Sequence, residues 1–182
     1  MRIGLIRHGL TKWNADGIFQ GSSNTELSPL GVEQAEDAGQ LLVDRGWTRL
    51  YSSPLQRARQ TADIIGELTG LGAPELVEDL VERNFGDLEG KPYWAPDGTR
   101  VPLNDSVETV DSVVSRTTRV LASIAEGGSD ALVVCHGTVI RLFLDRLLAP
   151  RQSPRVNNLS LTILDGTPDA WRVPLLNGYP HD

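Results

Sequence analysis

The amino-acid sequence predicts an α/β fold of three layers, with helices on both faces of a largely parallel central sheet. Two short apolar runs carry this prediction, because residues 3–6 lead into Arg7-His8-Gly9 and residues 131–135 lead into His136-Gly137. An apolar run that gives way to a polar residue and glycine is typical of a buried parallel strand. Stretches of helical periodicity alternate with such runs, and no repeat or linker interrupts them, so we expect a single domain over residues 1–182.

Start and stop signals predict the elements that follow the first strand. Ser28 is a favourable N-cap for a helix with one apolar stripe, and Gly46 is expected to end that helix. A short strand is predicted over Arg49–Ser52. The next four residues, Ser53-Pro54-Leu55-Gln56, match a capping box and predict a helix that ends near Gly70.

The second half of the chain continues the same alternation. A striped segment predicts a helix over Val107–Glu126. The segment Val139–Leu148 is apolar on nearly every side, which is typical of a helix packed against a sheet, and Pro150 is expected to end it. Two closing strands are predicted over Leu159–Leu164 and Trp171–Val173.

Composition narrows the classes of function. The chain has 182 residues, of which 40% are hydrophobic and 23% are charged, as is usual for a globular protein. A single cysteine excludes a disulfide framework and zinc motifs with several cysteines. The net charge of −7 disfavours nucleic acid and anionic membranes as partners. The apolar run after Met1-Arg2 is too short for a signal peptide or a membrane span, so we expect a cytoplasmic protein; the sequence does not indicate its oligomeric state.

The two His-Gly pairs are the first candidates for chemistry. Ligands of open α/β sheets bind at the carboxyl ends of the strands, so His8 and His136 face each other there if their strands are neighbours. A neutral imidazole is a good nucleophile toward phosphorus when one ring nitrogen donates to a carbonyl and the other stays free. Two structural histidines are the alternative, but the shared position after a strand favours function. Arg7 beside His8 indicates an anion rather than a metal ion, and we expect neither a metal nor an organic cofactor.

Arginine at the start of a helix is a second signal. Arg57 falls in the first turn of the helix predicted after Ser53, where a cation opposes the helix dipole unless an anion is bound there. Arg7 and Arg57 can clamp a phosphoryl group with bidentate hydrogen bonds. Arg59 is interpreted instead as a solvated surface residue.

The proton donor is less clearly marked. Three acidic residues, Glu82, Asp87 and Glu89, surround the segment Arg83-Asn84-Phe85-Gly86, and composition alone does not choose among them. Cys135 precedes His136 directly, but successive strand residues point to opposite faces, so we expect Cys135 to be a buried core residue that does not act with the histidine.

Two loops are expected near the strand ends. Residues 12–27 include the short polar groups of Asn14, Gln20 and Gly21, which can hydrogen-bond a phosphate, although a plain surface loop has a similar composition. The segment Lys91–Asn104 is rich in proline, glycine and aromatic residues, and we expect it to lie over the crevice.

Five blocks of the chain resemble the histidine phosphatase superfamily, in its phosphoglycerate-mutase-like group, and they occur in that family's order over most of the sequence. They are Arg7-His8-Gly9 with Thr11, Trp13 and Asn14; Gln20-Gly21 with residues 27–35; residues 52–62; Glu82 with Phe85-Gly86 and Glu89-Gly90; and residues 133–137.

The resemblance implies a role for each matching residue. His8 would be the phosphorylated nucleophile, Arg7, Arg57 and His136 the phosphate pocket, and Glu82 the proton donor. Asn14 and Gln20 would add phosphate contacts, and Gly21 and Gly137 are assigned with them to substrate binding. The chain departs from the family pattern at Leu10, at Ile18 and at residues 104–106, which affects substrate preference rather than chemistry.

The function that we predict is hydrolysis of small-molecule phosphate monoesters through a phosphohistidine, without a metal. A phosphoglycerate mutase of the same family is one alternative, but the family's mutases carry a basic insertion, and residues 91–104 offer only Lys91 and Arg100. A phosphate-sensing or interaction protein without turnover is another. Such a protein would be expected to lack His8 or Glu82, and both are present.

Overall fold

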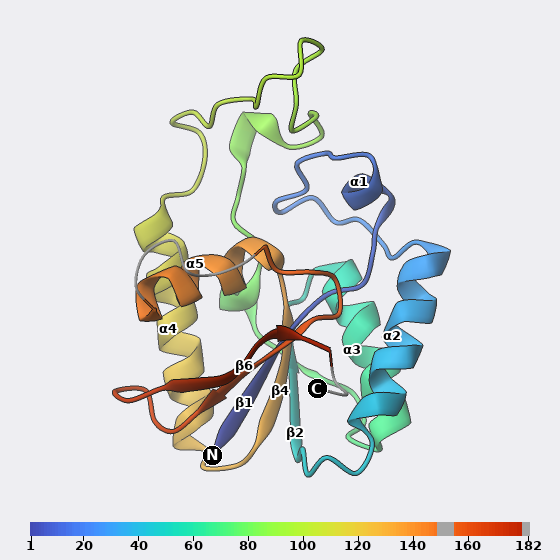
Figure 1. Ribbon diagram of the computed structural model, residues 1–182, viewed down its shortest axis with the longest axis vertical. Helices are drawn as coiled ribbons and strands as arrows, with labels where there is room; N and C mark the ends of the chain where they lie inside the picture. Colours follow the sequence, from blue (N-terminus) through green and yellow to red (C-terminus); the bar gives the residue numbers. More distant parts are fainter. Residues whose placement is uncertain (149–154, 180–182) are drawn as a thin grey trace.

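The computed structural model describes residues 1–148 and 155–179 and contains a six-stranded sheet with the strand order β3-β2-β4-β1-β5-β6 (Figure 1). β1 pairs in parallel with β4, which pairs in parallel with β2, and β2 with β3. β5 and β6 add an antiparallel edge beside β1. The strands span Arg2–Arg7 (β1), Arg49–Ser52 (β2), Glu75–Leu76 (β3), Ala131–Cys135 (β4), Leu161–Asp165 (β5) and Arg172–Gly178 (β6). The predicted, largely parallel sheet is therefore confirmed.

Helices cover both faces of this sheet, as predicted (Figure 1). α2 (Pro29–Leu42) and α3 (Gln56–Thr69) pack on one face, and α4 (Val110–Glu126) and α5 (Gly137–Leu147) pack on the other. The two cores share the central strands, because alternate residues of a strand point to opposite faces. In β4, Val133 and Cys135 belong to the core beneath α4 and α5, whereas Leu132 and Val134 belong to the core beneath α2 and α3.

Several helix boundaries differ from the sequence prediction. α2 begins as expected, with the Ser28 hydroxyl accepting from the Gly31 N–H, but it ends at Leu42 rather than near Gly46. α4 begins three residues later than predicted, at Val110, where the Thr109 hydroxyl caps it. The residue predicted to start it, Val107, packs instead with Phe19 and Leu88 in a small separate core.

The predicted capping box at Ser53 is wrong. α3 begins at Gln56, its N-cap is Leu55, and no side chain caps it. Its other end is as predicted, since Gly70 adopts a left-handed conformation with φ of 73° directly after Thr69. The Ser53 hydroxyl lies ahead of the helix, where it contacts His136 and accepts from the Leu55 N–H.

In the last third of the chain, the helix and strand boundaries differ from the predicted ones by a few residues. α5 begins at Gly137, immediately after His136, two residues before the predicted start. The expected stop at Pro150 lies outside the described residues. Both closing strands exist, but β5 begins at Leu161 because Leu159 turns with φ of 55° and donates its N–H to the Arg7 carbonyl. β6 is longer than predicted.

The connections after β1 and β3 gather at one end of the sheet, where α5 also begins after β4 (Figure 1). They include the short helix α1 (Lys12–Ala15), the 3₁₀ turns Glu78–Leu80 and Gly86–Leu88, and the long loop that contains residues 91–104. The carboxyl ends of the parallel strands therefore open into a region built from loops. Within the described residues, no helix combines the length and the apolar character that crossing a membrane requires.

Candidate active site

A cavity of about 710 Å³ lies among these loops. Every site residue predicted from the sequence lines it except His136, which lies directly behind His8 with the ring centroids 5.2 Å apart. The pairing of β1 with β4 explains this approach, because Arg7 and Cys135 are register partners and the two histidines follow them. Residues separated by 128 positions in the chain therefore share one site.

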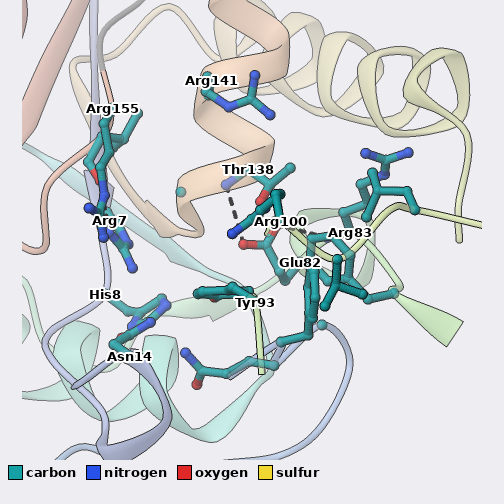
Figure 2. A pocket seen from close by; sticks show the side chains of 18 of the residues that line it. Arg7, His8, Asn14, Glu82, Arg83, Tyr93, Arg100, Thr138, Arg141 and Arg155 are labelled. Atoms are coloured by element: carbon teal, nitrogen blue, oxygen red, sulfur yellow. Dashed lines mark hydrogen bonds between the residues drawn. The ribbon is translucent and has the colours of Figure 1, made fainter. Parts of the chain in front are cut away.

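His8 is poised as a neutral nucleophile. Its Nδ1 lies 2.7 Å from the Gly9 carbonyl oxygen, which can only accept, so Nδ1 carries the proton and Nε2 keeps its lone pair. Burial, reinforced by the charges of Arg57 and Arg7, holds the pKa of His8 well below its ordinary value. Asn158 fixes the backbone at His8, because its side-chain N–H donates to the His8 carbonyl at 2.8 Å. Figure 2 shows the His8 ring beside Arg7.

His136 is completely buried and is anchored on one side only. Its Nε2 lies 2.8 Å from the Ser53 hydroxyl, while its Nδ1 is buried without a hydrogen-bond partner among the described residues. Burial, followed by the charge of Arg57, holds the pKa of His136 well below its ordinary value, so the ring is neutral. An unpaired buried N–H is costly unless a ligand engages it.

Arg7 and Arg57, like His136, each have a buried nitrogen atom without a hydrogen-bond partner among the described residues. Arg7 donates through Nη1 to the Val156 carbonyl, and Arg57 donates through both Nη atoms, to the Ser23 and Gly21 carbonyls. The Nε atoms of both arginines are buried without a partner in the described part of the chain. Burial lowers the pKa of Arg57 to about 10, which still leaves it charged at pH 7.

Gly137 allows Arg7 to take this position. A Cβ on Gly137 would lie 3.1 Å from Arg7 Nε and 3.2 Å from its Cδ, closer than most side chains tolerate. The first residue of α5 is thus packed directly against the guanidinium. A side chain at position 137 would push the Arg7 side chain aside by a few tenths of an ångström, so glycine fits there for a steric reason rather than for backbone conformation.

Glu82 faces the same cavity from the far side (Figure 2). Its Oε1 accepts from the Arg83 N–H at 2.8 Å, and its Oε2 accepts from the Thr138 N–H at 3.3 Å. These two backbone donors fix the carboxyl group at the start of α5. Of the three acidic residues that the sequence left open, Glu82 is the one that lines the cavity.

Asp87 and Glu89 are placed elsewhere. Asp87 is exposed. The Glu89 carboxylate accepts from the N–H and hydroxyl groups of Ser22 and Ser23 and from the Phe85 N–H, and these hydrogen bonds lower its pKa against the effect of burial. Glu89 therefore fastens the loop that carries Gly21.

The polar loop after His8 lines the cavity through Asn14, Gln20 and Gly21. The Gln20 amide oxygen accepts from the Thr11 and Thr25 hydroxyls, which orients the other half of the amide. Gly21 has φ of 52°, and a Cβ there would collide with the Glu89 carboxylate. The hydrogen bonds of Gln20 and the close contact between Gly21 and Glu89 therefore hold this loop in place.

Two expectations about neighbours of the site are confirmed. Arg59 is exposed and lies 3.7 Å from Asp63, outside the cavity. Cys135 is buried in the core beneath α4 and α5, and burial raises the pKa of its thiol to about 12. Neither residue takes part in the site.

Sequence reasoning missed several residues of the site. The sequence places Ser53 in a helix cap and gives no signal for Asn158. Among the other lining residues that it does not mark are Arg83, Tyr93, Arg100, Arg141 and Arg155. The composition of residues 91–104 did indicate the loop over the crevice, which is confirmed, but an isolated arginine gives no signal of which way it points.

The fold and the cavity together define an α/β protein with a cationic site built on two neutral histidines. A family model described as the histidine phosphatase superfamily (branch 1) matches residues 3–178, and the chain belongs to that family.

Individual relatives agree with this assignment. The chain is 32% identical to the phosphatase PhoE of Bacillus subtilis, itself described as uncharacterized, over 97% of this chain and 94% of that protein. It is 32% identical to a probable phosphoglycerate mutase, GpmB, of Yersinia pestis, over 94% and 87% of the two chains. A mycobacterial glucosyl-3-phosphoglycerate phosphatase in complex with VO₃ superimposes with a TM-score of 0.82 at 29% identity, over 97% of this chain and 98% of that one.

Proposed function

We propose that the protein hydrolyses phosphate monoesters of small molecules through a phosphohistidine formed on His8. The observation that carries the proposal is a set of three buried nitrogen atoms without hydrogen-bond partners in the described residues, Arg7 Nε, Arg57 Nε and His136 Nδ1, on side chains that lie near the neutral ring of His8. An anion with several oxygens satisfies all three. Its phosphorus would then lie within reach of the free Nε2.

The first half-reaction transfers the phosphoryl group to the protein. The lone pair of His8 Nε2 attacks phosphorus, and the bond between phosphorus and the ester oxygen breaks. Arg7, Arg57 and His136 stabilise the charge on the other phosphoryl oxygens. The leaving oxygen takes a proton from Glu82, whose carboxyl group is held at the cavity wall by the Arg83 and Thr138 N–H groups.

The second half-reaction returns the protein to its starting state. Glu82, now a carboxylate, accepts a proton from water, and the water oxygen attacks the phosphorus bound to His8. The bond between nitrogen and phosphorus breaks, inorganic phosphate leaves, and His8 Nε2 regains its lone pair. Asn14, Gln20, Gly21 and Gly137 complete the wall around the phosphate.

Relatives with phosphatase names support hydrolysis, while other relatives are named probable phosphoglycerate mutases. A mutase has to keep water from its phosphohistidine and return the phosphoryl group to the substrate. Incubation with each phosphoglycerate isomer, followed by analysis for inorganic phosphate and for the other isomer, separates the two activities. We expect inorganic phosphate as the product.

Acid-quench trapping tests the proposed intermediate. Protein mixed with a ³²P-labelled monoester and quenched within milliseconds should carry a phosphate that is labile in acid and stable in base. His8→Ala should carry none while keeping the wild-type melting temperature to within a few degrees. A label that maps to His136, or hydrolysis with no trapped label, would contradict the assignment of His8.

We also propose that one domain carries the whole activity and acts in the cytoplasm on small molecules. The acidic net charge and the lack of a second cysteine support this setting.

A further inference from the structure

The cavity is strongly cationic beyond its phosphate pocket. Besides Arg7 and Arg57, it is lined by Arg83, Arg100, Arg141 and Arg155, and Glu82 is the one carboxylate among the described lining residues (Figure 2). This contrasts with a net charge of −7 for the chain. Two arginines balance a phosphate dianion, so the remaining positive charge needs another explanation.

Two of these four arginines have structural partners. Arg83 donates through Nε to the Glu108 carbonyl at 2.7 Å and lies over the Phe85 ring. Arg141 forms an ion pair with Asp145 at 3.2 Å, one turn along α5. Arg83 and Arg141 therefore interact with neighbouring residues of the cavity wall.

Arg100 and Arg155 are different. Neither has a carboxylate or carbonyl oxygen within hydrogen-bond distance in the described part of the chain, and both are exposed to the cavity. The Arg100 guanidinium lies over the rings of Phe19, Tyr93 and Trp94, at 5.4, 4.7 and 5.2 Å from their centroids. Stacking orients a guanidinium and leaves its N–H edge available for an anion.

Both arginines lie close to the phosphate pocket. Figure 2 shows Arg155 beside Arg7 and Arg100 beside Tyr93, and all four residues line the cavity that contains His8. A substituent attached to the phosphate by a short carbon chain would therefore point into the part of the cavity that Arg100 and Arg155 line, while phosphorus remains at His8.

We infer that the substrate is a phosphate monoester that carries a second anionic group on a short scaffold, and that Arg100 and Arg155 bind this second group. The inference rests on the proposed function. A carboxylate and a second phosphate offer the same paired oxygens to a guanidinium, so the shared chemistry is a second anion. Arg100 and Arg155 are then specificity-determining residues, distinct from the arginines that clamp the transferred phosphoryl group.

Kinetics on matched substrate pairs test this inference. 3-Phosphoglycerate and glycerol 3-phosphate differ in a carboxylate against a hydroxymethyl group, and 1,3-propanediol bisphosphate and its monophosphate differ in a second phosphate. For the wild type we expect kcat/KM to favour the doubly anionic member of at least one pair by about tenfold or more. The pair that shows the preference identifies the second group as carboxylate or phosphate.

Substitutions then locate the preference. Arg100→Gln and Arg155→Gln should each lower the ratio of kcat/KM between the two members several-fold, and the double substitution should bring it close to one. Arg59→Gln is the matched control, because Arg59 is an exposed arginine outside the cavity, and it should leave the ratio unchanged.

Three results overturn the inference. The first is a wild-type ratio near one for both pairs, and the second is a ratio that survives the double substitution. The third is a loss of kcat/KM by the same factor on both members, which would mean that the two arginines only attract phosphate in general. Hydrolysis of p-nitrophenyl phosphate is measured in parallel, since failure on that substrate as well would contradict the proposed phosphatase function instead.

Discussion

The Ser53 hydroxyl oxygen lies 2.8 Å from His136 Nε2, and both side chains are completely buried. The Leu55 N–H donates to the same oxygen at 3.3 Å, and the hydroxyl can give its own proton to an unprotonated Nε2. His136 then carries its own proton on Nδ1, the atom that has no protein partner in the described residues. Ser53 therefore positions His136 and selects the tautomer that can donate to a phosphoryl oxygen.

Ser53→Ala should lower kcat by about tenfold with little change in KM, because it removes one buried hydrogen bond and the preference for the Nδ1 proton. Ser52→Ala is the matched control: Ser52 is equally buried, but its hydroxyl donates to the Ser53 carbonyl rather than to a histidine. ¹⁵N NMR of the His136 ring should show the change of tautomer in the Ser53 variant only. Equal losses of kcat in the two variants would mean that both serines are merely structural.

Arg57→Ala should reduce kcat/KM on the order of 10²-fold, since Arg57 supplies a buried charge and an unpaired N–H at the phosphate pocket. Arg59→Ala should stay within about twofold, because Arg59 is exposed and outside the cavity. Thermal melts are needed beside the kinetics, as Arg57 also holds the Gly21 and Ser23 carbonyls. Similar losses from the two variants would show that the helix presents a different face to the substrate.

Glu82→Gln should lose roughly 10²- to 10⁴-fold in rate on an alkyl phosphate, whose leaving oxygen needs a proton. On p-nitrophenyl phosphate the deficit should shrink, because that leaving group departs without protonation. The measurement is kcat/KM over a series of leaving groups of rising pKa. An equal deficit across the series would assign Glu82 to substrate positioning instead.

The neighbouring carboxylates are the controls for Glu82. Asp87→Asn should behave as the wild type throughout, because Asp87 is exposed. Glu89→Gln should lower the melting temperature, since the carboxylate accepts hydrogen bonds from Ser22, Ser23 and Phe85. Whatever activity Glu89→Gln loses should not depend on the leaving group.

The two buried histidines should make stability depend on pH below neutrality. Their pKa values are held low in the folded protein by burial and by the Arg57 charge, so the unfolded chain binds more protons once the pH falls below about 6.5. The free energy of unfolding should therefore fall as the pH drops from 6.5 to 5, at up to about 1.4 kcal/mol per pH unit for each histidine.

Urea unfolding at several pH values measures this slope. The double variant His8→Asn, His136→Gln should lose most of it. The carboxylates with lowered pKa values, Glu89, Glu108 and Asp130, lose their stabilising contribution only at lower pH, near and below about 4.5, so they do not obscure the window. The same slope in the wild type and the double variant would contradict the assignment of neutral buried histidines.

The parts of the fold and site that sequence predicted well are those with a local signature. An apolar run that ends in His-Gly marks both central strands, and it predicts that His8 and His136 face each other if these strands are neighbours, as β1 and β4 are. Ser28 marks the start of α2, because its hydroxyl accepts from a free backbone N–H of the first turn. Gly70 marks the end of α3, because a residue without a side chain adopts the left-handed conformation there at no steric cost.

The parts that sequence did not predict depend on contacts between distant segments. Ser53 sits in a sequence that suits a cap, yet β4 places His136 beside its hydroxyl, and that tertiary contact takes precedence. Val107 continues the apolar stripe of α4 but packs on Phe19 and Leu88 instead. The direction of Arg100 follows from three aromatic rings, two of them in its own loop, and no periodicity encodes such an arrangement.

The neighbours of β1 also constrain the order in which the chain can fold. β1 lies more than a hundred residues before its partners β4 and β5, which begin at residues 131 and 161. Contacts of such long sequence separation form late and slowly. During synthesis the nascent chain thus exposes the apolar residues Ile3, Leu5 and Ile6 without a strand to pair with, and His8 cannot be activated until β4 has been made.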